Sequence, residues 1–184
     1  VERDRVKKLM DDASFEAIRY HYGDRRAERS GVYLIGHIIE GLKILVRIGA
    51  SRTAQQAWCL HPIVQSNDDL VKTLLDGIPV NFGNQHIKPL ILAMEYRAVA
   101  NSYLSDMTPD KRKLREDVNR IPAIRQMLIA DKVQNRKDFV AQPEGTYPNE
   151  IALNTYFEDW LDNILGLDPC DVDAYDYLIN EDRE

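Results

Sequence analysis

Three side chains in this sequence could together bind a divalent metal ion: His37, His61 and Asp131. Mn²⁺ and similar ions accept both imidazole nitrogen and carboxylate oxygen, so two histidines and one aspartate form a chemically coherent ligand set. The three residues lie 24 and 70 positions apart, so only tertiary packing could bring them together. A single histidine on an apolar helix face is more often a core residue than a ligand. That alternative stays open for both histidines.

Helices must position these residues, because apolar residues recur along the chain at spacings of three and four. The most apolar segment stops at Gly49, a common helix terminator, and Ser51 is suited to cap the next helix. The expected helices cover Val6–Tyr22, Val32–Ile48, Thr53–Leu60, His86–Tyr103, Ile121–Arg136 and Glu150–Leu165, and Ile78–Phe82 could hold a short extended piece. The sequence therefore predicts an all-α fold.

The length of the chain favours one domain, because 184 residues suffice for one hydrophobic core but are few for two. We expect a helical domain over residues 1–167. Residues 168–184 hold seven acidic residues against the single Arg183, which predicts a peripheral acidic tail.

Charge and composition exclude several classes of function. The net charge of −6 argues against a general nucleic-acid or membrane-surface binder, which would usually be basic. No apolar run approaches the length of about 18–20 residues that a membrane span needs. Cys59 and Cys170 are far apart and have no metal-like spacing, so we expect a reduced, cytoplasmic protein. The chain has neither a GxxxxGK[ST] nor a GxGxxG phosphate-binding motif.

The amino-acid sequences around the three candidate ligands all resemble segments of one protein family. SGVYLIGHIIEGLKILVRIGA resembles the first ligand helix of the SpoT/Rel-type (p)ppGpp hydrolase domain, a member of the HD superfamily. AQQAWCLHPIV is similar to the helix that ends in the family's His-Asp pair, and LIADKVQN resembles its closing Ala-Asp signature. With Phe157 in an aromatic closing helix, the resemblance extends over about residues 15–165 and matches the single-domain metazoan SpoT homologues in size.

The resemblance implies an HD-domain-like helical bundle and a role for each matching residue. His37, His61 and Asp131 would bind Mn²⁺. Arg26 would contact the guanine base and Asn135 the nucleotide. Two further residues would line the same pocket, namely Tyr33 and Lys132.

Three positions depart from the family pattern. The metal-ligand aspartate after His61 is replaced by Pro62, and the catalytic Glu-Asp pair by Gln65 and Ser66. Losing a general base costs about 10²–10⁴ in rate. Losing a carboxylate ligand also weakens the ion that activates water. Hydrolysis by the family's usual mechanism is therefore not expected.

Three other acidic residues could substitute for the missing carboxylates: Asp68, Asp69 and Glu95. We expect Asp68 and Asp69 instead to cap a helix that starts near Leu70, and Glu95 to form an ion pair with Arg97 or with a neighbouring helix. His21 and His86 are expected to be surface or packing residues, although His21 lies near Arg25 and Arg26 and could assist a phosphate pocket.

The sequence thus supports three hypotheses. The first is a SpoT-like pseudo-hydrolase that binds a guanine nucleotide such as (p)ppGpp, or a protein partner, at a degenerate catalytic centre. The second is an active Mn²⁺-dependent phosphohydrolase completed by one of the substitute carboxylates. The third is a structural interaction protein whose functional surface is the acidic tail over residues 171–184.

Overall fold

The computed structural model describes residues 2–27, 31–75, 87–104, 111–141, 145–146 and 149–165. Ile78–Phe82, His86 and the acidic tail lie outside these ranges, so the predictions for them stay predictions. The helices of the described residues are α1 (Glu2–Met10), α2 (Ala13–Tyr22), α3 (Leu34–Arg47), α4 (Arg52–Leu60), the 3-10 helix η1 (His61–Val64), α5 (Asn67–Leu75), α6 (Ile87–Leu104), α7 (Lys111–Arg120), α8 (Pro122–Val140) and α9 (Glu150–Leu165).

The described residues contain no β-strand, and their one β-bridge pairs Arg26 with Tyr33. The all-α prediction is therefore confirmed for this part of the chain. No helix among the described residues is both long enough and apolar enough to cross a membrane.

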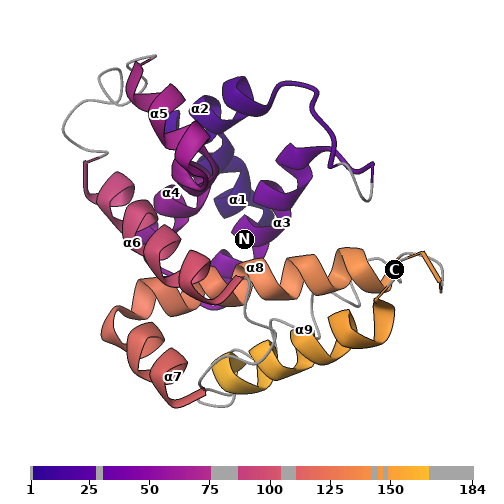
Figure 1. The fold of residues 1–184 in the computed structure, drawn as a ribbon. Coiled ribbons are helices and arrows are strands. Elements are labelled where there is room, and N and C mark those ends of the chain that lie inside the picture. Colours follow the sequence, from indigo (N-terminus) through magenta and orange to yellow (C-terminus); the bar gives the residue numbers. More distant parts are fainter. Residues whose placement is uncertain are drawn as a thin grey trace.

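Helix α8 runs through the centre of the molecule, with α1–α5 on one side and α7 and α9 on the other (Figure 1). It contacts α3, α4, α6, α7 and α9. Asp131 lies on this helix. The central position of α8 therefore allows residues from the N-terminal helices to meet residues from the C-terminal ones.

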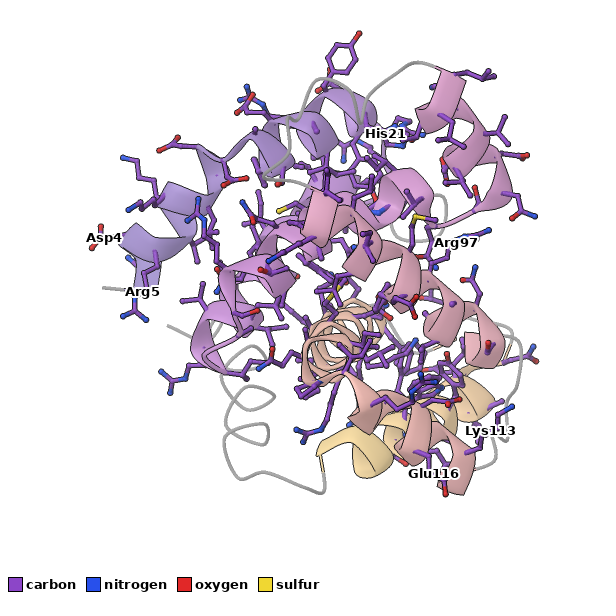
Figure 2. The ribbon with its side chains drawn as sticks, turned by 90° about the vertical axis from the view of Figure 1, so that its left-hand side faces the viewer. Asp4, Arg5, His21, Arg97, Lys113 and Glu116 are labelled. Atoms are coloured by element: carbon purple, nitrogen blue, oxygen red, sulfur yellow. The ribbon has the colours of Figure 1, made fainter. Side chains whose placement is uncertain are left out.

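A single hydrophobic cluster fills the space between the helices. The two tryptophans, Trp58 and Trp160, are 0 % and 1 % exposed. Cys59 is also buried, and burial raises the pKa of its thiol, which agrees with an inert core cysteine. Figure 2 shows side chains filling the interior, while Lys113 and Glu116 of α7 lie at the outer edge.

One predicted helix is in fact two, because the segment Val6–Tyr22 breaks at Asp12. The Asp12 carboxylate accepts a hydrogen bond from the Ser14 amide at 3.0 Å and so caps the start of α2. It also accepts from Arg52 at 2.6 Å and from Gln56 at 3.0 Å, both on α4. The break thus ties α2 to α4, a tertiary contact that apolar periodicity does not reveal.

Other helix ends agree more closely with the sequence. The Ser51 hydroxyl accepts from the Ala54 amide at 3.2 Å, which confirms Ser51 as the cap of α4. Helix α9 has the predicted bounds. The prediction for α5 is wrong in detail, because the helix starts at Asn67 and the Ser66 hydroxyl accepts from the Asp69 amide at 3.0 Å. A serine is the shorter, uncharged cap, and it leaves both aspartates in the first turn.

Candidate functional site

The structure brings His37, His61 and Asp131 together, and we call these three residues the histidine cluster. They come from the first turns of α3, the junction of α4 with η1, and the middle of α8. His37 Nε2 lies 3.7 Å from Asp131 Oδ1, and the two imidazole rings are 5.8 Å apart. The side chains of His37 and Asp131 are 20 % and 13 % exposed, so solvent reaches both.

The indole of Trp58 supports both histidines. Its ring centroid lies 4.4 Å from that of His61 and 5.0 Å from that of His37. Trp58 Nε1 donates to the Ile38 carbonyl on α3 at 3.0 Å. This close approach requires Gly41, since a Cβ at that position would lie 2.2 Å from the indole. The pair Gly41–Trp58 therefore sets the spacing between α3 and α4 beside the cluster.

His61 is held as a neutral imidazole. Its Nδ1 lies 2.6 Å from the Trp58 carbonyl, which can only accept, so Nδ1 carries a proton and Nε2 is left with a lone pair. Burial and the neighbouring His37 lower the pKa of His61 to about 4, against the opposite effects of the Trp58 carbonyl and Asp131. At neutral pH His61 is therefore an uncharged acceptor.

His37 is oriented by Gln134, a residue that the sequence did not single out. Gln134 Nε2 lies 2.8 Å from Asp138 Oδ2 and 3.1 Å from Glu40 Oε2, so the amide nitrogen faces the two carboxylates. The amide oxygen is then left for His37 Nδ1, which must carry the proton of that hydrogen bond. Like His61, His37 thus carries its proton on Nδ1 and leaves Nε2 unprotonated.

Asp131 is a carboxylate whose charge is already compensated. Lys132 Nζ lies 3.1 Å from Asp131 Oδ2, and Asn135 Nδ2 donates to Oδ1 at 2.9 Å. Burial alone would raise the pKa of Asp131, but Lys132 and the two histidines outweigh burial and lower it. Asp131 is therefore an ionised group that stabilises positive charge around it.

Lys132 is the buried counterion of this aspartate rather than a side chain open to a ligand. It is 3 % exposed, and its Nζ lies 3.3 Å from the Tyr156 hydroxyl and 4.6 Å from the centre of the Trp160 ring. Burial lowers the pKa of Lys132, but Asp131 and Tyr156 outweigh this effect and raise it. The cation–π contacts connect the cluster to α9.

The cluster does not have the form of a complete metal site. Within the described residues, no group of three or more His, Cys, Asp or Glu side chains is arranged to hold a metal ion. The sole carboxylate of the cluster already has Lys132 and Asn135 as partners. Hard divalent cations are usually held by more anionic charge than this. The donor set therefore does not fit Mn²⁺ well.

Arg26, predicted to contact the base, and Tyr33, predicted to line the same pocket, lie beside one another at the start of α3. The Arg26 guanidinium lies 3.6 Å from the centre of the Tyr33 ring, and its Nη1 donates to the Gly31 carbonyl at 2.7 Å. Tyr33 is 45 % exposed and precedes His37 by four residues, about one helical turn. The pair thus forms a flat, exposed surface next to the cluster.

The three degenerate positions have structural roles. Pro62 is buried within η1. The Gln65 side chain donates to Asn101 at 2.8 Å, and the Gln65 carbonyl accepts from Arg97 at 3.0 Å, so this residue joins η1 to α6. Ser66 caps α5. None of them supplies an acid or base to the cluster.

Of the three possible substitute carboxylates, Asp69 is the one that is partly buried. Its Oδ1 lies 3.8 Å from His21 Nε2, and its Oδ2 accepts from the Ser66 hydroxyl at 2.6 Å. Burial raises the pKa of Tyr22, Arg25 opposes this, and both Asp69 and Asp131 add to the increase. Tyr22 therefore lies within electrostatic reach of both carboxylates. Asp68 and Glu95 are exposed.

The residues that orient His37 were not predicted from the sequence, although their spacing from the candidate ligands could have indicated them. Glu40 follows His37 by three positions on α3, and Gln134 follows Asp131 by three on α8, so each pair shares a helix face. Lys137 completes this group by an ion pair with Glu40 at 2.6 Å. Polar residues at this spacing beside a candidate ligand are candidates for orienting it.

Comparison of the chain with known protein families, with curated proteins and with solved structures finds no match.

Proposed function

We propose that this protein is a SpoT-like, HD-type domain that binds a guanine nucleotide such as (p)ppGpp at the histidine cluster without hydrolysing it. The observation that carries the proposal is the convergence of His37, His61 and Asp131, with His37 and Asp131 partly exposed, beside positions where catalytic acids would stand but do not. The family itself is inferred from the resemblance of the sequence motifs.

The phosphate end of the ligand would lie at the histidine cluster. His37 has its Nδ1 committed to Gln134, so its Nε2 is the atom available to the ligand. A hydroxyl group of the nucleotide, on a phosphate or on the ribose, can donate a hydrogen bond to the lone pair of that nitrogen. The partial exposure of His37 and Asp131 gives the ligand access.

The base would stack at Arg26 and Tyr33. An exposed tyrosine ring with a guanidinium at 3.6 Å offers a flat surface to a purine. Stacking of a base on an aromatic side chain contributes about 1–3 kcal/mol. Because Tyr33 lies about one turn before His37, a nucleotide stacked there can reach the cluster with its phosphates.

Absence of hydrolysis follows from the site chemistry. General-base catalysis requires a group that can accept a proton within hydrogen-bond reach of the attacking water. Pro62, Gln65 and Ser66 cannot do so, and Asp131 is committed to Lys132 and Asn135. Among the described residues, the positions of the family's catalytic carboxylates thus supply no base for cleavage by the usual mechanism.

Isothermal titration calorimetry with GDP, GTP and ppGpp, each with and without Mn²⁺, tests the proposal. ATP serves as the control for base selectivity. We expect guanine nucleotides to bind at least about ten-fold more tightly than ATP, with Tyr33→Ala weakening them about ten-fold. Tyr20→Ala is the matched control, because Tyr20 is an 88 % exposed tyrosine on α2. No binding at millimolar nucleotide, or equal losses in both variants, would refute nucleotide binding here.

A second candidate function is an active phosphohydrolase in which Asp69 supplies the missing carboxylate. The observation that favours it is that Asp69, which is partly buried, lies against a histidine, with its Oδ1 3.8 Å from His21 Nε2. Phosphate release from a nucleotide panel with Mn²⁺ distinguishes the two functions. If the protein is active, Asp69→Asn should abolish release and Asp68→Asn, at the exposed neighbouring aspartate, should not. Release that survives Asp69→Asn, or no release at all, excludes this candidate.

A further inference from the structure

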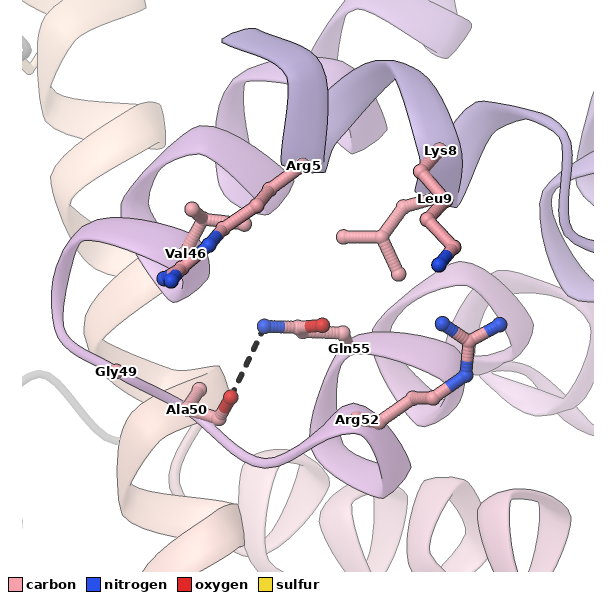
Figure 3. Close-up of a pocket in the computed structure, with 8 residues that line it drawn as sticks. All are labelled: Arg5, Lys8, Leu9, Val46, Gly49, Ala50, Arg52 and Gln55. Atoms are coloured by element: carbon pink, nitrogen blue, oxygen red, sulfur yellow. Dashed lines mark hydrogen bonds between the residues drawn. The ribbon is translucent and has the colours of Figure 1, made fainter. Parts of the chain in front are cut away.

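A basic pocket lies away from the histidine cluster, between α1, the α3–α4 connection and the start of α4. Its volume is about 220 Å³. Figure 3 shows the eight residues that line it. They are Arg5, Lys8, Leu9, Val46, Gly49, Ala50, Arg52 and Gln55. Three of the eight are cationic and none is acidic, although the whole chain carries a net charge of −6.

The cations of the pocket are poorly compensated. Arg5 and Lys8 share one face of α1 at a spacing of three residues, where like charges repel each other. Within the described residues neither forms an ion pair. Arg52 is paired with Asp12 at 2.6 Å, but its side chain remains 55 % exposed. A bound anion would relieve the repulsion that this arrangement creates.

The pocket is also organised by its uncharged residues. Gln55 Nε2 donates to the Ala50 carbonyl at 2.9 Å, which holds the amide across the floor of the pocket (Figure 3). The first residue of the nine-residue helix α4 is Arg52, so the positive end of the helix dipole adds to the three side chains. In the view of Figure 3, Arg5 lies at one end of the pocket and Lys8 with Arg52 at the other.

We propose that this pocket binds a small, multiply charged oxyanion of the phosphate or pyrophosphate class. Guanidinium and ammonium groups are the side chains that recognise phosphate oxygens, by forked hydrogen bonds and by charge respectively. The volume suits such an anion better than a whole nucleotide, since pockets for drug-sized ligands span roughly 300–1,000 Å³. The separation of the cations along the pocket favours pyrophosphate over monophosphate.

Titration of the full chain with inorganic phosphate and with pyrophosphate tests this site, by calorimetry and by backbone amide NMR shifts. We expect pyrophosphate to bind more tightly and to shift the amides of Arg5, Lys8 and Arg52. The double variant Arg5→Gln/Lys8→Gln should weaken binding at least about ten-fold, because two charge-assisted contacts are lost. Arg52 is left intact, because it also holds Asp12 at the start of α2.

The matched control is Arg3→Gln/Lys7→Gln, which removes the same charge from exposed positions of α1 that do not line the pocket. It should change the affinity by less than about two-fold if binding is local rather than a response to net charge. Equal weakening by both double variants, or no binding of either anion, would overturn the proposal. Arg5→Gln/Lys8→Gln should leave the affinity for GDP at the histidine cluster unchanged, so failure here and failure of the histidine cluster to bind nucleotide are separate results.

Discussion

Replacing Gly41 with alanine should disturb the packing that supports both histidines. The added Cβ would lie 2.2 Å from Trp58 Cζ2, 2.3 Å from Cε2 and 2.5 Å from Nε1, where ordinary contact begins near 3.4 Å. Trp58 is completely buried, so the indole has no free space into which it can move. Either α3 and α4 must separate or the indole must rotate away from its hydrogen bond to the Ile38 carbonyl.

The expected loss of stability follows from three contributions. Overpacking of a filled core costs about 1–3 kcal/mol. An indole N–H left buried without its acceptor costs about 1–3 kcal/mol more. Replacing a helical glycine by alanine returns up to about 1 kcal/mol through helix propensity. We therefore expect Gly41→Ala to lower the free energy of unfolding by about 3 kcal/mol.

Gly36→Ala is the matched control within the same helix. The nearest atom to a Cβ at that position is Val32 Cγ1 at 3.7 Å, an ordinary contact. Alanine there should raise the free energy of unfolding by about 0.5–1 kcal/mol. Urea denaturation of the two variants and the wild type measures the opposite signs directly.

Equal shifts of the free energy of unfolding in Gly41→Ala and Gly36→Ala would show that the packing of α3 against α4 does not require Gly41. A double-mutant cycle adds a stricter requirement, because the clash involves Trp58 alone. The loss in free energy of unfolding caused by Trp58→Phe should be at least about 1 kcal/mol smaller in the Gly41→Ala background than in the wild type. Additive losses would show that the indole is not the group that Gly41 accommodates.

The remaining predictions concern the charges and hydrogen bonds of the histidine cluster. The pKa of His61 is lowered from 6.5 to about 4 in the folded protein, so on acidification His61 of the unfolded chain binds a proton first. The free energy of unfolding should therefore fall by about 3 kcal/mol as the pH drops from 6.5 to 4. His61→Asn should remove this part of the pH dependence, as measured by urea denaturation at each pH. Lys132→Met leaves the buried Asp131 carboxylate without its counterion and should lower the free energy of unfolding by about 3–5 kcal/mol. The double variant Asp131→Asn/Lys132→Met should recover most of this loss. Equal stabilities of the single and double variants would contradict the pairing. Gln134→Leu should lower the free energy of unfolding by about 1–3 kcal/mol and should release His37 from its single tautomer. The change of tautomer would be visible in the imidazole ¹⁵N shifts of His37. Unchanged shifts would argue against the orienting role of Gln134.

Local sequence signals predicted much of the helical framework. Ser51 caps α4 because a hydroxyl can accept from the amide three residues later, and this needs no tertiary contact. Gly49 follows α3 with a positive φ of 66°, a conformation that glycine adopts without a steric cost. Helix α9 has its predicted limits. Each of these features is encoded within a few residues of the chain.

Features that depend on distant partners could not be predicted in this way. The break at Asp12 is stabilised by Arg52 and Gln56, about forty residues later in the chain. The orienting role of Gln134 depends on His37, 97 residues away, and on two carboxylates. Lys132 was expected to face a ligand, but its burial beside Tyr156 and Trp160 is a property of the packed α8–α9 interface.

Helices α3 and α4 extend from the basic pocket to the histidine cluster, so both candidate sites rest on one pair of elements. Arg52 begins α4 in the pocket and His61 follows its end at the cluster, a separation of about 14 Å along nine residues. Gly41 and Trp58 hold the two helices in direct contact between these ends. Energetic coupling between distant sites requires an element with two discrete arrangements, and a contact with no spare volume leaves little room for a second one. Ligands at the pocket and at the cluster should therefore bind independently, with affinities that respond additively to substitutions at the two sites.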